Sequence, residues 1–198
     1  MHLTSFSCSH VTQSMTKFIS RVVTADEIDY QEMTYKKKGA AKQIHEFTYG
    51  ITSDPLIEFA CTMSALIHDL DHPGVPNAIL VKEGVDMADH YKNKSVAEQN
   101  SVDLAWDLLM EPKYRELRSV ICASSAEMER FRQLIVNSVM ATDIADKELG
   151  QLRKNRWEKA FSAEASDILE SPVDSVNRKA TIVIEHLIQA ADVAHTMQ

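Results

Sequence analysis

The sequence predicts an all-α protein, folded as one domain of packed helices over residues 1–198. In several stretches apolar residues recur every three or four positions, which is the period of an amphipathic helix. Glycine and proline number only five each, so long stretches run without a residue that breaks helices. No stretch alternates convincingly between apolar and polar residues, as a half-buried strand would.

Two helices are expected in the first half of the chain. Residues Val11 to Val23 form a short candidate. A clearer helix follows Ser53-Asp54-Pro55, because a polar cap before a proline is a typical helix start. We expect this helix to end at His68-Asp69. Its predicted buried stripe is Leu56, Phe59, Ala60, Met63 and Ile67.

Three further helices are expected in the second half. One starts at Ser95, one at the capping box formed by Ser124 and Glu127, and one at about Asn177. Loops are expected at residues 24–39, 72–76, 84–93 and 163–175. The predicted inward-facing residues are, in order, Val102, Trp106 and Leu109; Phe131, Leu134, Ile135 and Val139; and Ile184, Leu187, Ile188 and Ala191.

Charge and cysteine content narrow the function classes. The net charge of −8 argues against a nucleic-acid partner, which requires clustered basic residues. Three widely spaced cysteines, Cys8, Cys61 and Cys122, match no disulfide or metal-binding pattern. No signal peptide or membrane-spanning stretch is recognisable. We therefore expect a reduced, cytoplasmic location, and a membrane-associated parent protein stays open.

The densest cluster of polar residues lies where the Pro55 helix is expected to end. It reads His68-Asp69-Leu70-Asp71-His72, followed by Pro73-Gly74. An adjacent imidazole and carboxylate can ligate one cation, and a carboxylate can bridge to a second. His72, three residues after Asp69, could contact a metal-bound water or a phosphate.

Other acids lie far along the chain. Asp192 follows an apolar run, and the spacing does not decide between a metal ligand and a helix-surface residue. Glu98 follows Ser95 by three positions, so it could simply complete a capping box. Thr142-Asp143 interrupts an apolar stripe, which predicts a buried or half-buried acid there.

With these residues assembled, the chain resembles the class I 3′,5′-cyclic nucleotide phosphodiesterases, a branch of the HD-domain phosphohydrolases. The resemblance implies a multi-helix HD-domain bundle and covers the chain from about Ser9 to Gln198. Five motifs carry it in the family's order: residues 48–55 (Thr-Tyr-Gly-Ile-Thr-Ser-Asp-Pro), 65–77 (Ala-Leu-Ile-His-Asp-Leu-Asp-His-Pro-Gly-Val-Pro-Asn), 95–101 (Ser-Val-Ala-Glu-Gln-Asn-Ser), 140–143 (Met-Ala-Thr-Asp) and 191–195 (Ala-Asp-Val-Ala-His).

The resemblance implies a two-metal site, with zinc and either magnesium or manganese. His68, Asp69 and Asp192 match three of the four zinc ligands, and Asp69 is also shared with the second metal. His72 matches a histidine that hydrogen-bonds the waters and the phosphate. The residues matching those that hold the waters of the second metal are Glu98, Thr142 and Asp143.

The chain departs from the family at an early motif, His-Asn-x-x-His-Ala-x-x-Val. Aligned on Val11, Leu3 stands at the position of the acid and Ser7 at the position of the fourth zinc ligand. Cys8 and His10 are the nearby side chains that could replace this ligand. The resemblance also predicts a domain truncated at both ends, without the helices that grip the nucleotide base in relatives.

The activity implied is metal-assisted hydrolysis of cyclic nucleotides in signal transduction, with hydroxide attacking phosphorus and a proton delivered to the leaving 3′ oxygen. Two alternatives stay open. One is a degenerate, non-catalytic fragment that acts as a helical regulatory module. The other is an HD-type phosphohydrolase with a different nucleotide substrate. Additional regulatory domains are expected in the parent protein.

Overall fold

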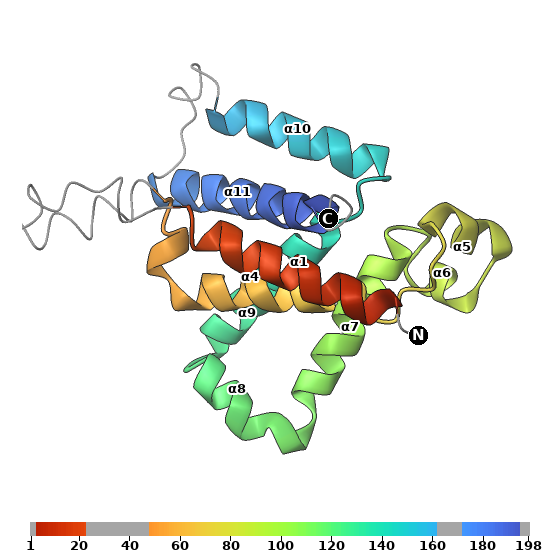
Figure 1. The fold of residues 1–198 in the computed structure, drawn as a ribbon, viewed down its shortest axis with the longest axis horizontal. Helices are drawn as coiled ribbons and strands as arrows, with labels where there is room; N and C mark the ends of the chain where they lie inside the picture. The colour runs from red at the N-terminus through yellow and green to blue at the C-terminus, as the bar shows by residue number, and fades with distance from the viewer. Residues whose placement is uncertain (1–2, 23–47, 162–171, 195–198) are drawn as a thin grey trace, which may run out of the picture.

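The computed structural model describes residues 3–22, 48–161 and 172–194, with side chains for all of these except 3–7 and 172–174. Within these ranges the secondary structure is helical and contains no strand, which confirms the predicted fold class (Figure 1). The helices are α1 (Leu3–Ile19), α4 (Pro55–Ile67), α5 (Asn77–Glu83), α6 (Asp86–His90), α7 (Val96–Met110), α8 (Arg115–Ile121), α9 (Ser125–Ala141), α10 (Lys147–Phe161) and α11 (Pro172–Ala194), with 3₁₀ turns η2 (Ile51–Ser53) and η3 (Pro112–Tyr114).

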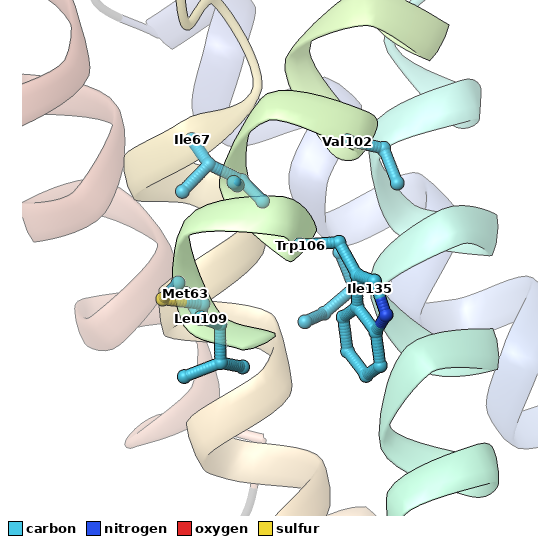
Figure 2. Close-up of a pocket in the computed structure, with 7 residues that line it drawn as sticks. Met63, Ile67, Val102, Trp106, Leu109 and Ile135 are labelled. Carbon is cyan, nitrogen blue, oxygen red and sulfur yellow. The ribbon is translucent and has the colours of Figure 1, made fainter. Parts of the chain in front are cut away.

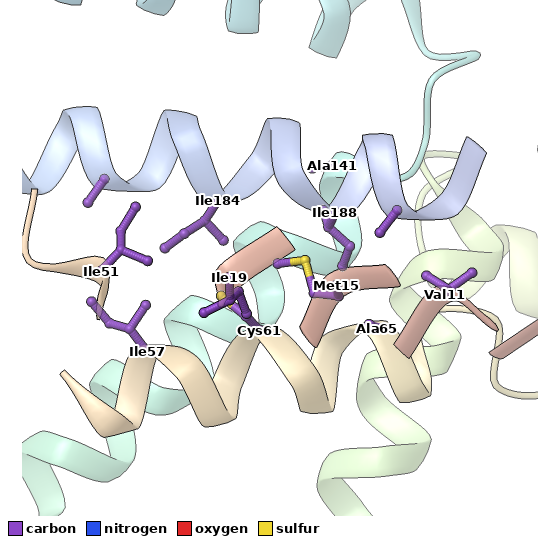
Figure 3. Close-up of a cluster of buried hydrophobic side chains, with 12 residues drawn as sticks. Val11, Met15, Ile19, Ile51, Ile57, Cys61, Ala65, Ala141, Ile184 and Ile188 are labelled. Atoms are coloured by element: carbon purple, nitrogen blue, oxygen red, sulfur yellow. The ribbon is translucent and has the colours of Figure 1, made fainter. Parts of the chain in front are cut away.

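Helix α4 lies at the centre of the bundle and contributes to two hydrophobic cores. One core joins it to α1 and α11, and Figure 3 shows these side chains pointing toward one another. The other joins it to α7 and α9. The first core contains Val11, Met15, Ile19, Ile51, Ile57, Cys61, Ala65, Ala141, Ala180, Ile184, Ile188 and Ala191. The second contains Ala60, Ile67, Val102, Ala105, Leu109, Cys122, Phe131, Ile135 and Val139.

The burial of α4 corrects one prediction. Ala60 and Ile67 are buried as expected, but Phe59 is 44% exposed. Its ring stacks on Phe131 at the rim of the second core, with ring centroids 5.7 Å apart. The predicted single stripe is wrong because α4 is covered on two sides, so Ile57 and Cys61 are buried as well. The predicted inward faces of α7, α9 and α11 do lie in the cores.

Two of the predicted helix starts are confirmed by their hydrogen bonds. Asp54 Oδ1 accepts from the backbone N–H of Leu56 at 2.9 Å, ahead of Pro55 in the first turn of α4. Ser124 Oγ accepts from the N–H of Glu127 at 3.2 Å. The Glu127 carboxylate reaches back to the N–H of Ala123, so this capping box is closed from both sides.

Other features of the fold were not predicted. The expected loop at residues 84–93 contains the short helix α6. Helix α10 was not anticipated, and it is joined to α11 by Arg156, whose Nη2 lies 2.7 and 2.5 Å from the two carboxylate oxygens of Glu185. Residues 24–39 and 163–171 lie outside the described ranges. Residues 172–175, expected as loop, already belong to α11. Among the described helices, none combines the length and the apolarity that a membrane crossing needs.

Between α4, α7 and α9 the second core leaves a narrow apolar gap with no room for a water-sized molecule (Figure 2). Its lining offers no charged side chain that could orient a polar ligand, so we treat it as a gap in packing. The lining residues are Met63, Ile67, Val102, Ala105, Trp106, Leu109 and Ile135.

The arrangement of α1, α4 and α11 determines where the polar motifs meet. The start of α1, the end of α4 and the end of α11 lie at the same end of the bundle (Figure 1). Val11, Ala65 and Ala191 are all fully buried in the first core near this end. The His68-Asp69 pair begins three residues after Ala65, and Asp192 directly follows Ala191, so they emerge beside the same packed layer.

Candidate metal centre

His68 caps the C-terminal end of α4 and is 1% exposed. Its Nδ1 lies 2.9 Å from the carbonyl oxygen of Ala65. A carbonyl oxygen can only accept, so Nδ1 carries a proton and donates it. In the neutral ring, Nε2 is then left with a free lone pair, as a metal ligand requires.

The Nε2 atom of His68 faces two carboxylates, one on the next residue in the sequence and one far along the chain. It lies 3.4 Å from Oδ2 of Asp69 and 3.4 Å from Oδ1 of Asp192. It is buried and forms no hydrogen bond within the described part of the chain. A lone pair facing two carboxylates is stable only with a proton or a cation between them.

The protonation of His68 reflects the same geometry. Burial alone would lower its pKa, but the nearby Asp192 carboxylate, and after it Asp69, raise the pKa above its ordinary value. Without a metal, the two carboxylates therefore favour the protonated form of the ring.

The structure thus brings together three residues that the sequence predicted as ligands, His68, Asp69 and Asp192. Their roles as ligands stay predictions. Among the described residues, no three His, Cys, Asp or Glu side chains are gathered as tightly as a bound metal would gather them. The donor set still fits a divalent cation by its chemistry, since it combines an unpartnered buried imidazole nitrogen with two acids.

Cys8, on α1, lies beside the same acids. Burial raises the pKa of its thiol, and the negative charges of Asp69 and Asp192 contribute to the rise. A hydrogen bond between the thiol and the backbone of Asp69 acts in the opposite direction. The side chains of Leu3 and Ser7 lie outside the described residues, so the structure does not address the departure from the family at these positions.

A second group of acids is organised by Asn77, the first residue of α5. Its Nδ2 donates to Oε2 of Glu98 at 2.8 Å and to Oδ2 of Asp143 at 3.2 Å. Its Oδ1 accepts from the backbone N–H of Ala97 at 3.0 Å. One amide therefore binds the buried acid Asp143 and the half-buried acid Glu98 and holds them side by side.

Ser95 completes this group and corrects a prediction. Its backbone is left-handed, with φ 37°, and its hydroxyl donates to Oδ2 of Asp143 at 2.7 Å. Ser95 and Glu98 therefore do not form the capping box that their spacing suggested. Asp143 is 4% exposed, as the interrupted stripe predicted. Burial raises the pKa of Glu98 above its ordinary value, and the hydrogen bond from Asn77 opposes this rise.

The two remaining predicted residues, His72 and Thr142, differ in their relation to the acids held by Asn77. Nδ1 of His72 accepts from the backbone N–H of Gly74 at 3.0 Å, so the neutral ring carries its proton on Nε2 and can donate it. His72 lies near enough to Glu98 to help lower the pKa of that acid. Thr142 directly precedes Asp143, but its hydroxyl donates to the carbonyl of Val139 in its own helix at 2.7 Å rather than to the acids.

Sequence reasoning missed the roles of Asn77 and Ser95. Asn77 closes the 65–77 motif, so its position was noted, but nothing in the local pattern indicates that it reaches Glu98 and Asp143, 21 and 66 residues away. Ser95 resembled a helix cap because Ser followed three positions later by Glu is common at helix starts.

Comparison with known families decides where this architecture belongs. The family model described as 3′5′-cyclic nucleotide phosphodiesterase matches residues 7–198. The chain belongs to this family. The family resemblance read from the motifs is therefore confirmed, and membership of the family implies a general dependence on divalent metal ions.

Curated relatives are similar over part of the chain. The human cGMP-inhibited 3′,5′-cyclic phosphodiesterase 3A is 35% identical over 108 residues, which is 49% of this chain and 9% of the relative. A probable 3′,5′-cyclic phosphodiesterase of Caenorhabditis elegans is 37% identical over 81 residues, 41% of this chain and 12% of the relative. The matched segments are thus a small part of these longer proteins.

Solved structures support the fold. The phosphodiesterase domain of the rhodopsin phosphodiesterase from the choanoflagellate Salpingoeca rosetta superposes with a TM-score of 0.57 at 22% identity. The match covers 80% of this chain and 48% of that one. A second structure of the phosphodiesterase domain from this fusion protein gives a TM-score of 0.55 over 78% of the chain, also at 22% identity.

Proposed function

We propose that this chain hydrolyses 3′,5′-cyclic nucleotides, cAMP or cGMP, to 5′-nucleoside monophosphates in signal transduction. The family assignment supports the reaction class. The observation that carries the proposal for this particular chain is the buried Nε2 of His68, which faces Asp69 and Asp192 without a hydrogen bond. Such an atom is costly to bury unless a cation or a proton occupies the space before it.

Zinc would be held by His68, Asp69 and Asp192, with Asp69 shared with a second cation, magnesium or manganese. When bound, such cations lower the pKa of water and neutralise charge that develops on phosphoryl oxygens. The residues proposed to hold the waters around the second cation are Glu98, Thr142 and Asp143.

The chain's own residues would position and orient the phosphate. The Nε2–H of His72 is a donor that can bond a phosphoryl oxygen, because Nδ1 is already occupied by the N–H of Gly74. Asn77 and Ser95 hold Asp143, and Asn77 also holds Glu98, so the acids need no reorientation when water binds.

Further proposals concern the context of the site. The two cores share α4, which supports residues 1–198 as one domain of a phosphodiesterase catalytic region. We propose a cyclic nucleotide as the small-molecule partner, a cytoplasmic location, and additional regulatory domains in the parent protein. The absence of a nucleic-acid partner stays a prediction from the charge of −8.

The test compares two matched variants. Asp69→Asn should remove bound metal and any hydrolysis of cAMP and cGMP while the helices stay folded. Asp71→Asn makes the same chemical change two residues away, at an exposed residue with φ 57° that asparagine tolerates well. Metal content by atomic emission and product formation by chromatography are the readouts. Full metal stoichiometry in Asp69→Asn would refute the site.

One alternative is favoured by a specific observation. The chain has Leu3 where relatives have the histidine that protonates the leaving oxygen, and leucine cannot donate a proton. A metal-loaded chain that binds cyclic nucleotide without hydrolysing it would therefore support a non-catalytic regulatory module. Hydrolysis of other nucleotides, with cyclic substrates untouched, would instead support a different HD-type phosphohydrolase.

A further inference from the structure

We propose that the thiolate of Cys8 serves as the fourth protein ligand of the cation held by His68, Asp69 and Asp192. This inference rests on the proposed metal-dependent function and names a ligand that differs in type and position from the family's histidine. It replaces the ligand lost at Ser7 with a side chain that this chain itself supplies.

The packing of three helices places Cys8 at the site. Val11, Ala65 and Ala191 belong to the same buried cluster. Figure 3 shows Val11 and Ala65 close together toward the end of α4. Cys8 lies three residues before Val11, His68 lies three after Ala65, and Asp192 directly follows Ala191. Because α1 runs opposite to α4 and α11, one turn backward on α1 and one turn forward on α4 both lead toward the same end of the bundle (Figure 1).

The electrostatics of the site agree with this placement. The charges of Asp69 and Asp192 and the backbone of Asp69 all act on the pKa of the Cys8 thiol, so this side chain lies near them. Independently, the buried Nε2 of His68 points into the same space without a hydrogen-bond partner. A sulfur, an imidazole nitrogen and two carboxylates thus come from neighbouring residues at one end of the bundle, although they are not drawn together as tightly as around a bound metal. This mixture of ligand types suits zinc.

His10 is a poorer candidate for the same role. It follows Cys8 by two residues, which turns it about 200° around α1. Cys8 therefore points in a different direction from His10, and the influence of Asp69 and Asp192 on the pKa of its thiol indicates that this direction is toward the acids.

Ligation by Cys8 requires the thiol to lose its proton, because the thiolate is the form that binds metal. The S–H bond breaks, the sulfur lone pair binds the cation, and the proton leaves to solvent. The thiolate also biases the site toward zinc over magnesium or manganese, since thiolates are soft ligands. We expect zinc affinity to fall at least about 10-fold without it, since loss of even an outer-shell partner commonly costs 10–100-fold.

Cobalt reports thiolate ligation directly. The metal-free chain is titrated with Co²⁺, and absorbance is followed in the near ultraviolet, where a thiolate bound to cobalt gives an intense charge-transfer band. We expect the band in the wild-type chain and in Cys122→Ala, whose thiol lies in the second core away from the site. Cys8→Ala should lack the band, and zinc competition should show the weaker binding.

Each outcome decides a different claim. Cobalt binding without a thiolate band, or a band that persists in Cys8→Ala, would overturn the role of Cys8 and leave the metal site standing. A wild-type chain that binds neither cobalt nor zinc would overturn both. If Cys8→Ala fails to fold, the wild-type chain still gives the answer: zinc should slow alkylation of Cys8 by iodoacetamide, measured on the Cys8 peptide by mass spectrometry, and an unchanged rate would refute ligation.

Discussion

Replacing Asn77 with alanine is expected to destabilise the fold at the proposed second-metal site. The amide donates to Glu98 at 2.8 Å and to Asp143 at 3.2 Å, and it accepts from Ala97 at 3.0 Å. Hydrogen bonds to charged groups contribute about 1.5–3 kcal/mol each, and a neutral one contributes about 1 kcal/mol. Ser95 still binds Asp143 in the variant, and half-buried Asn77 can be partly replaced by water, so we expect a loss of about 3 kcal/mol.

The stability lost in Asn77→Ala should depend on pH, and the direction of this dependence shows whether Glu98 is responsible. In the wild-type chain the hydrogen bond from Asn77 lowers the pKa of Glu98, which burial raises. Without that bond the folded-state pKa of Glu98 rises further above its unfolded value. A raised folded-state pKa favours folding below the unfolded pKa, and this advantage disappears as the pH rises through the folded pKa. The free energy of unfolding that Asn77→Ala loses relative to the wild-type chain should therefore be largest near neutral pH and become smaller at acid pH.

The assay is urea denaturation followed by circular dichroism at several pH values, with EDTA present so that metal binding does not contribute. Asn155→Ala, on the exposed face of α10, is the matched control and should change stability by less than about 0.5 kcal/mol. Asn77→Asp should be at least as damaging as alanine at neutral pH, because it turns a donor into a third carboxylate. If Asn77→Ala loses the same free energy of unfolding at every pH, or loses less than about 1 kcal/mol, the role assigned to the Asn77 hydrogen bonds is wrong.

Three further substitutions test the scaffold. Arg156→Met should lower the free energy of unfolding by about 2–3 kcal/mol in urea, since it leaves the 5% exposed Glu185 unpaired, and adding Glu185→Gln should recover more than half of that loss. Gly84→Ala should cost about 1–2 kcal/mol because φ is 63°, seen as a melting temperature several degrees lower; an unchanged value would contradict the assigned left-handed cap. Ser124→Ala should cost about 1 kcal/mol in the same melting assay, and equal stability would show that the cap on α9 contributes nothing.

The features that could be predicted from sequence are those encoded locally. The start of α9 is set by Ser124 and Glu127, which contact each other across one turn, so their spacing alone reveals the cap. His68 and Asp69 are adjacent, and the apolar helix before them indicates that they emerge from a buried layer.

The features that were missed depend on contacts between distant segments. Ser95 has the spacing of a cap, but Asp143, 48 residues away, takes its hydroxyl. Phe59 fits an apolar stripe, yet its burial depends on which neighbours cover α4, and periodicity does not specify neighbours. Cys8 is one of three isolated cysteines in the sequence, and only the packing of α1 places it beside Asp69.

The first core has a consequence for how the chain is made. Its side chains come mainly from α1 and α4, which are synthesised early, and from α11, the last of the described helices to emerge from the ribosome. Until then the nascent chain exposes Met15, Ile57 and Cys61, which α11 helps to cover. Such late closure favours aggregation of incomplete chains, so we expect this protein to depend on chaperones during translation more than a helical bundle with local contacts would.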